Sequence, residues 1–154
     1  MQRPLKIISG GQAGADMGGL IGARQVGIAT GGTAPKGFRT ELGDQAQELS
    51  DYGLVEHVKK NYQGRTRQNI VDADATLIFA TVTDSPGTRL TIDLCQELCK
   101  PYLVVDPQED CTQNIRDFLQ QTEPSILNIA GNRESKSTGI EARTVELVAA
   151  VFAS

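Results

Sequence analysis

Apolar runs and amphipathic segments alternate along the chain, and glycine-rich or polar segments separate them. The apolar runs predict buried strands at 5–9, 75–81, 101–106 and 125–131. Segment 28–41 begins as a further short strand and becomes a loop. The amphipathic segments predict helices at 16–27, 65–74, 88–100, 111–122 and 138–154. Segment 42–64 stays ambiguous between a short strand and a helical turn.

The order of these elements predicts an α/β fold. Alternating strands and helices are typical of a mostly parallel sheet whose right-handed crossover helices pack on both faces. Five strands are expected, and segment 42–64 leaves room for a slightly larger sheet. A chain of 154 residues has the length of one domain, and no repeat, low-complexity tract or linker divides it. We therefore expect a single domain over residues 1–154.

Charge and composition narrow the classes of partner. The formal net charge is −4, and the chain has four phenylalanines, three tyrosines and no tryptophan. A general nucleic-acid binder usually has a basic excess and aromatic side chains for base stacking. No segment approaches the ~20 apolar residues of a membrane-spanning helix, and the N-terminal apolar run is too short for a secretory signal. We therefore expect a cytoplasmic protein with neither a membrane nor a nucleic-acid partner.

Cysteine and histidine are scarce. The chain has three cysteines and one histidine, and an odd cysteine count argues against a disulfide scaffold. Cys95 and Cys99 would share one face of a helix, either as a metal or redox pair or, as we favour, as two small buried side chains. His57 is interpreted as structural or exposed rather than catalytic. No site that binds a metal directly is expected.

A glycine-rich loop, SGGQAGAD, follows the first predicted strand and leads into a helix. Gly10, Gly11 and Gly14 permit backbone angles and close approaches that a side chain would block. The N–H groups and positive dipole end of the helix would face this loop, which could then hold a phosphate or another anion. The alternative is tight packing of strand against helix. The loop has neither the P-loop spacing nor a complete G-x-G-x-x-G pattern.

Two further loops have the composition of ligand-binding loops, and ligands of such folds bind at the carboxyl ends of the strands. Loop 30–41 combines three glycines with Lys36 and Arg39, which suits an anionic ligand or, alternatively, a solvated surface. In loop 83–91, Thr88 is either the N-cap of a helix or a ligand contact, and we favour the N-cap. Four loops of this kind at one edge of a sheet, with loop 130–144, are a stronger signal than any one of them.

Loop 130–144 is long and polar and lies between the last predicted strand and the last predicted helix. Arg65 and Arg67 could enter the same site from the start of a helix, or they could be two surface arginines. Thr112 is a plausible N-cap of the helix at 111–122.

Five motifs occur in the order found in the molybdenum carrier family, and the chain resembles that family from about residue 5 to residue 150. The motifs are ISGGQAGADMGGL, GGTAPKGFRTE, RTRQNIVDADATLIF, GTRLTIDLCQELCKPYLVVD and LNIAGNRESKSTGIEART. That family is similar to a wider group of Rossmann-like nucleotide binders that includes the Lonely Guy lysine-decarboxylase-like proteins and DNA-processing protein A. The resemblance implies a Rossmann-like fold and a phosphorylated, nucleotide-like ligand. The family name indicates molybdenum cofactor (molybdopterin), a pterin dithiolene with a terminal phosphate.

By motif position, the resemblance distributes the ligand-binding residues over four loops. They are Gly10, Gly11, Gln12, Gly14, Asp16, Pro35, Lys36, Gly37, Gly87, Thr88, Gly131, Asn132, Arg133, Glu134 and Ser135. Two positions depart from the family pattern, in which a threonine is frequent at the position of Ala13 and an aromatic residue at that of Thr33. These departures would weaken one phosphate contact and one stacking surface. The relatives often form homo-oligomers, so that a dimer or tetramer is expected.

Three functions are weighed, and the sequence leaves open whether the protein is an enzyme. The first is a carrier or sensor of a phosphorylated pterin or nucleotide, which agrees with the absence of a Ser-His-Asp or Cys-His arrangement in the sequence. The second is a nucleoside-monophosphate N-glycosidic-bond hydrolase of the Lonely Guy type. The third, a nucleic-acid-processing partner, is disfavoured by the charge.

The hydrolase would use Glu134 beside Arg133, with Asp16 or Glu41 as a second carboxylate. The relatives' compact Gly-Gly-x-Gly-Thr motif followed by a glutamate has no close counterpart in loop 130–144, which favours the carrier. For the glycine-rich loop, we expect Gly11→Val to abolish ligand binding with a modest loss of fold.

Overall fold

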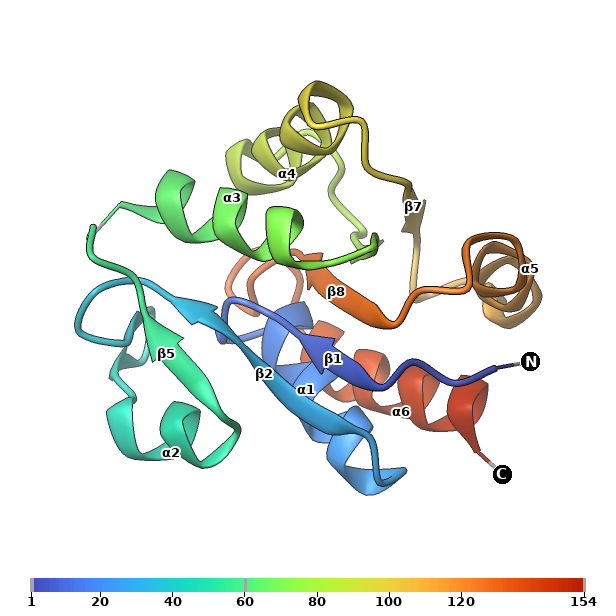
Figure 1. Cartoon of the computed structure of the whole chain (residues 1–154), viewed down its shortest axis with the longest axis horizontal. Coiled ribbons are helices and arrows are strands. Elements are labelled where there is room, and N and C mark those ends of the chain that lie inside the picture. The colour runs from blue at the N-terminus through green and yellow to red at the C-terminus, as the bar shows by residue number, and fades with distance from the viewer. Residues whose placement is uncertain (1, 60, 154) are drawn as a thin grey trace.

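The computed structural model describes residues 2–59 and 61–153 and has an α/β fold in which a six-stranded sheet lies between two layers of helices (Figure 1). The order of the strands is β5-β2-β1-β8-β6-β7, and all neighbours are parallel. The strands are β1 (Lys6–Ile8), β2 (Ala29–Ala34), β5 (Leu54–Glu56), β6 (Ala75–Phe79), β7 (Tyr102–Val105) and β8 (Ile126–Gly131). Two short strands, β3 (Arg39–Thr40) and β4 (Gly43–Asp44), form a separate antiparallel pair.

The helices cover both faces of the sheet, as the alternation of elements predicts. Four pack on one face through shared apolar clusters, namely α1 (Ala15–Gln25), α2 (Ala46–Asp51), α5 (Thr112–Thr122) and α6 (Ile140–Phe152). Two lie on the other face, namely α3 (Tyr62–Asp72) and α4 (Pro86–Glu97) (Figure 1). None of the helices in the described ranges has the length and apolar character that crossing a bilayer requires.

The core follows from the continuous apolar runs. All five residues of β6 are buried, because this strand has a neighbour on each side and helices on both faces. Phe79 is 0% exposed and packs in one cluster with Leu127 and Ile129 of β8. Burying a side chain of this size contributes about 2–3 kcal/mol to stability. The predicted strands at 5–9, 75–81, 101–106 and 125–131 are therefore confirmed, with ends shifted by one or two residues.

Glycines in α1 let the first helix approach the last one closely. An added Cβ at Gly18 would lie 2.7 Å from the Thr144 Cβ, and one at Gly22 would lie 2.8 Å from the Val148 Cβ. A Cβ at Gly19 would lie 2.7 Å from the Cγ2 of Ile129 in β8. Glycine costs about 1 kcal/mol relative to alanine inside a helix. The close packing of α1 on α6 and β8 offsets this cost and explains these three glycines of α1.

The ambiguous segment 42–64 contains the sixth strand. β5 pairs with β2 at the edge of the sheet, and α2 precedes it. Residue 60 of this segment lies outside the described residues, as do residue 1 of the predicted domain and residue 154 of the predicted last helix.

Two predicted N-caps are wrong. α4 begins at Pro86 with Ser85 as its N-cap, so that Thr88 lies inside the first turn and is 1% exposed. Proline suits the first helical position because its missing N–H would have no partner there. In α5 the N-cap is Cys111, and Thr112 is the first helical residue.

The cysteine interpretation is half right. Cys95 is buried inside α4, but Cys99 is exposed. Cys99 lies beyond the last residue of α4 and has a φ of 54°, so that the helical spacing that would align the two side chains is lost. His57 makes a local structural contact, in which its Nδ1 accepts a hydrogen bond from the Lys59 N–H at 3.0 Å.

Candidate functional site

A pocket of about 330 Å³ opens between the first turns of α1, α3 and α4 and the carboxyl end of β8. Seven residues predicted from the sequence line it, namely Gln12, Asp16, Gly87, Thr88, Gly131, Asn132 and Arg133. Further lining residues that carry polar or aromatic side chains are Tyr62, Arg65, Thr66, Ser85, Thr91 and Lys136. The pocket therefore lies where the order of elements predicts a ligand site, at the carboxyl ends of parallel strands.

The remaining predicted residues do not line this pocket. They are Gly10, Gly11, Gly14, Pro35, Lys36, Gly37, Glu134 and Ser135. Lys36 is exposed, and Gly37 donates its N–H to Glu56 Oε2 at 2.7 Å. Whether any of these residues contacts a ligand stays a prediction.

The structure shows which of Arg65 and Arg67 enters the pocket. The Arg65 side chain is 13% exposed and lines the pocket, and its Nη1 lies 3.3 Å from Oδ2 of Asp16. Gly10 makes room for this guanidinium, because a Cβ at that position would overlap Nη1. Arg67, on the same helix, is exposed and pairs with Glu97 at 3.1 Å. Only the first arginine of the pair belongs to the pocket.

Asp16 is the acidic member of this pair, and its side chain is 6% exposed. Burial raises the pKa of Asp16 above its ordinary value of 3.8, while Arg65 and the N–H of Gln12 lower it. Burial likewise lowers the pKa of the Arg65 guanidinium. A neutral Asp16 would leave a buried guanidinium unpaired, which is costly, so that the two groups stabilise each other as an ion pair at neutral pH.

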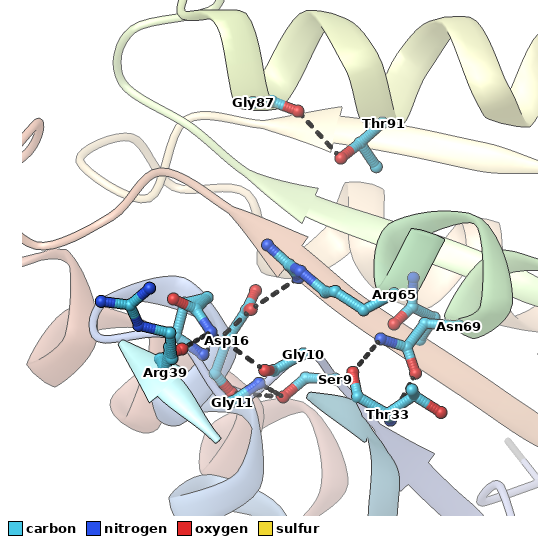
Figure 2. Close-up of polar contacts among 12 residues, drawn as sticks. Ser9, Gly10, Gly11, Asp16, Thr33, Arg39, Arg65, Asn69, Gly87 and Thr91 are labelled. Atoms are coloured by element: carbon cyan, nitrogen blue, oxygen red, sulfur yellow. Dashed lines mark hydrogen bonds and ion pairs between the residues drawn. The ribbon is translucent and has the colours of Figure 1, made fainter. Parts of the chain in front are cut away.

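α3 is held against the sheet by an amide that pairs with the backbone of β2. Asn69 Nδ2 donates to the Thr33 carbonyl at 2.9 Å, and the Thr33 N–H donates to Asn69 Oδ1 at 2.8 Å. Figure 2 shows this pair one turn along α3 from Arg65. Asn69 and Thr33 are both buried. The paired amide therefore fixes the position from which Arg65 reaches the pocket.

The pocket carries more basic than acidic groups. Arg65, Arg133 and Lys136 line it, and Asp16 is the one carboxylate among its lining residues in the described ranges. The Arg133 guanidinium lies over the Tyr62 ring, 4.3 Å from its centroid. This contact joins the loop after β8 to the first turn of α3. Besides the ion pair of Asp16 with Arg65, the pocket therefore has two further cationic side chains, Arg133 and Lys136.

The N-terminus of α4 adds donors to the same pocket. Ser85 makes no side-chain capping hydrogen bond, and Pro86 has no N–H. Within the described ranges no group accepts a hydrogen bond from the N–H of Gly87 or Thr88. Such N–H groups and the helix dipole attract anions. Figure 2 shows Gly87 across the pocket from Asp16 and Arg65.

Asn132 fastens the loop before α4 to the loop after β8. Its Oδ1 accepts from the N–H groups of Thr81 and Val82 at 2.9 and 3.0 Å. Its Nδ2 donates to the Val82 carbonyl at 2.9 Å and to Thr88 Oγ1 at 3.1 Å. The side chain is buried at 2% exposure. The amide is thus satisfied inside the protein and sets the wall of the pocket.

The N–H groups of the glycine-rich loop are largely used inside the protein. The Gly11 N–H donates to Ser9 Oγ at 3.2 Å, and the Gly14 N–H donates to Glu141 Oε1 at 3.1 Å. Gly11 has a φ of +74°, and an added Cβ there would lie 2.8 Å from methyl carbons of Leu49 and Leu54. These contacts support the packing interpretation at Gly11. A ligand phosphate in this loop stays a prediction.

Glu134 and Arg133 are neighbours in sequence, but their side chains make separate contacts. Glu134 Oε2 accepts from the Gly139 N–H at 2.6 Å, and its Oε1 accepts from the Glu141 N–H at 3.0 Å. The carboxylate therefore caps the N-terminus of α6. Ser135 donates its hydroxyl to Glu41 Oε2 at 2.5 Å. Neither glutamate lines the pocket.

Two buried polar atoms beside the pocket have no hydrogen-bond partner among the described residues. They are Gln12 Oε1 and Arg65 Nε. Gln12 Nε2 donates to the Arg39 carbonyl at 2.9 Å, which fixes the amide with its oxygen as the free acceptor. Within residues 2–59 and 61–153, no group of three or more His, Cys, Asp or Glu side chains is placed to hold a metal ion.

Comparison with known proteins identifies the family to which the chain belongs. No curated protein matches it. Its structure is similar to the 1.45 Å crystal structure of a protein named "putative molybdenum carrier protein" from Syntrophus aciditrophicus SB, with 35% sequence identity, a TM-score of 0.90 and coverage of 98% of this chain and 96% of that one. Residues 7–152 match the model of the circularly permutated YpsA SLOG family. These similarities confirm the resemblance found in the motifs, and the chain belongs to the circularly permutated YpsA SLOG family.

Proposed function

We propose that the protein binds a phosphorylated, nucleotide-like ligand in the pocket between α1, α3 and α4. One observation carries the proposal. The free N–H groups of Gly87 and Thr88, at the start of a 12-residue helix, face a pocket that Arg133 and Lys136 also line. A helix N-terminus with nearby cations is a binding site for a phosphate.

The size of the pocket limits the ligand. A volume of about 330 Å³ is at the lower end of the range for small-molecule sites. It therefore suits a single mononucleotide or pterin phosphate rather than a dinucleotide. Ala13, Leu90 and Ala130 supply apolar wall beside the ring of Tyr62, which suits a planar heterocycle.

Molybdenum cofactor is the specific ligand that we propose. The name of the similar protein supports it, and so does the fit of one terminal phosphate to the start of α4. When bound, this cofactor supplies the dithiolene that holds the metal. The chain's own residues would hold the phosphate through Gly87, Thr88 and Arg133, and Lys136 would neutralise it.

The pocket favours binding over hydrolysis. Hydrolysis of an N-glycosidic bond needs a carboxylate beside the sugar. Asp16 is the one carboxylate among the described lining residues, and it is paired with Arg65. Glu134 is engaged by backbone N–H groups of α6. We therefore propose a carrier or sensor.

The experiment begins with mass spectrometry of small molecules released from the gently purified protein, with metal analysis of the same sample. A phosphorylated pterin with molybdenum would support the carrier, and a nucleotide without metal would support a sensor. Titration calorimetry then compares AMP with adenosine. We expect AMP to bind at least about tenfold more tightly, because the phosphate makes charge-assisted hydrogen bonds.

Variants locate the site. Arg133→Gln is expected to weaken AMP binding about tenfold. Arg67→Gln, which removes an exposed arginine outside the pocket, should bind AMP as the wild type does. Equal affinities for AMP and adenosine, or an Arg133→Gln variant that binds AMP normally, would show that the phosphate does not bind in this pocket.

A further inference from the structure

We infer that Asp16 makes the pocket selective for ligands that bring an O–H or N–H donor together with their phosphate, and that it disfavours bare oxyanions such as sulfate and molybdate. The inference rests on the proposed function, because it concerns the same pocket. It predicts that a molybdenum carrier of this structure takes the metal within an organic ligand and not as the free oxyanion.

The geometry leaves Asp16 with unused acceptor capacity. Oδ2 accepts from Arg65 Nη1 at 3.3 Å and from the Gln12 N–H at 3.2 Å. No group in the described ranges donates a hydrogen bond to Oδ1. A carboxylate has about four acceptor positions. Figure 2 shows Asp16 on the wall opposite Gly87 and Thr91.

Burial makes this free acceptor selective. The Asp16 side chain is only 6% exposed, so that water screens its charge poorly. Its ion pair with Arg65 is formally neutral, but Asp16 lines the pocket and its Oδ1 accepts no hydrogen bond within the described ranges. An O–H or N–H group of the ligand would satisfy that oxygen with a charge-assisted hydrogen bond. An oxygen of a fully ionised anion would be repelled by it.

The candidate ligands differ in whether they carry an O–H or N–H donor. Sulfate and molybdate are dianions without a proton at neutral pH. A sugar phosphate brings hydroxyl groups, and a purine or pterin phosphate brings ring N–H or amino groups. Gln12 also lines the pocket, but its Oε1, an acceptor without a donor in the described ranges, is buried. Asp16 is therefore the acceptor through which the pocket favours a donor-bearing ligand.

Titration calorimetry at neutral pH and constant ionic strength tests the inference on the wild-type protein. The probes are AMP, ribose 5-phosphate, methyl phosphate, sulfate and molybdate. Methyl phosphate, sulfate and molybdate carry neither a sugar hydroxyl nor a ring N–H. We expect AMP to bind more than about tenfold more tightly than these three probes. If sugar hydroxyls supply the donor, ribose 5-phosphate shares this advantage. If the heterocycle supplies it, only AMP does.

Asp16→Asn tests the residue itself. We expect the ratio of AMP affinity to sulfate and molybdate affinity to fall about tenfold, because the variant removes the repulsion and weakens the hydrogen bond. Asp93→Asn removes the same charge from an exposed position of α4 outside the pocket and should leave the ratio unchanged. If Asp16→Asn does not fold, the wild-type series decides.

Three outcomes overturn the inference, and they differ in whether the proposed function still holds. If wild-type protein binds sulfate or molybdate within about threefold of AMP, or if Asp16→Asn keeps the wild-type ratio, Asp16 does not select the ligand. Binding of AMP that depends on Arg133 would then still support the proposed function. If none of the phosphorylated probes binds, the proposed function fails and the inference fails with it.

Discussion

Glu134 is the residue at which a catalytic and a structural role give opposite experimental results. As a catalytic acid it would be needed for turnover and not for folding. In the structure its two carboxylate oxygens accept from the N–H groups of Gly139 and Glu141 at 2.6 and 3.0 Å. The 13-residue helix α6 that follows packs against α1 and the core. Glu134→Gln keeps the shape of the side chain and changes only its charge and its hydrogen bonds.

The expected cost follows from these two contacts. A glutamine keeps one acceptor oxygen, but its amide nitrogen then faces a backbone donor, so that one hydrogen bond at the helix start is lost. Losing a capping bond costs about 1 kcal/mol, and losing a negative charge at a helix N-terminus costs about 0.3–1 kcal/mol. We expect a total of about 2 kcal/mol. For a domain of this size that lowers Tm by about 4–8 °C.

Thermal and urea denaturation followed by circular dichroism measure this loss. Glu109→Gln is a matched control, because Glu109 is exposed and its side chain makes no hydrogen bond among the described contacts. The control should melt as the wild type does, and both variants should bind AMP normally. A Glu134→Gln protein that keeps the wild-type Tm but loses ligand affinity or turnover would refute the capping role and return Glu134 to the ligand site.

The remaining predictions concern the glycine loop, Asp16 and α3. Gly11→Val should destabilise the fold by about 3 kcal/mol in urea denaturation, because valine must adopt a φ of +74° and overlaps Leu49 and Leu54; an unchanged midpoint would contradict this. Burial raises the pKa of Asp16 above 3.8, so that it binds a proton at a higher pH than an ordinary aspartate. Calorimetry should therefore show sulfate binding more tightly as the pH falls toward that pKa, and Asp16→Asn should abolish this trend, since sulfate and the neighbouring arginines keep their charge. Asn69→Ala should cost about 3 kcal/mol, because both polar backbone groups of Thr33 lose a buried partner; exposed Asn114→Ala is the control, and an equal Tm for the two would be inconsistent with the role of Asn69.

Five of the six strands were predictable from local pattern, including β7 at one edge of the sheet, but β5 at the other edge was not. The sequence ATLIF of β6 is apolar throughout because both of its faces are covered. β5 has three residues, and Val55 in its middle is 61% exposed. An edge strand of this length needs no continuous apolar run, so that its sequence does not differ from a loop. Only pairing with β2 makes it a strand.

The sequence at the start of α4 contained a correct signal for the first helical residue, but the N-cap prediction gave more weight to Thr88. Thr88 is a residue type that favours N-caps, but Pro86 two residues earlier is typical of the first helical position. Weighting the proline over the threonine would have placed Gly87 and Thr88 inside the first turn, where their N–H groups face the pocket.

The ion pair of the pocket had no local signal. Asp16 and Arg65 are 49 positions apart in the sequence, and their contact depends on how α1 and α3 sit over neighbouring strands. The motif resemblance placed Asp16 in the site but left the role of Arg65 open. Glu134 shows the opposite case, because its position in a polar loop suggested chemistry while its side chain caps the following helix.

The strand order also has a consequence for synthesis of the protein. β1 lies between β2 and β8, and α1 packs on α6, so that both contacts join an early part of this sequence to segments that are synthesised much later. One edge of β1 has no partner until β8 is made, and the glycine-lined surface of α1 has none until α6 is made. A nascent chain with an uncovered strand edge is prone to aggregate. A stop codon before α6 would leave the apolar core surface that α6 covers exposed. It should therefore produce an insoluble fragment rather than a smaller folded domain.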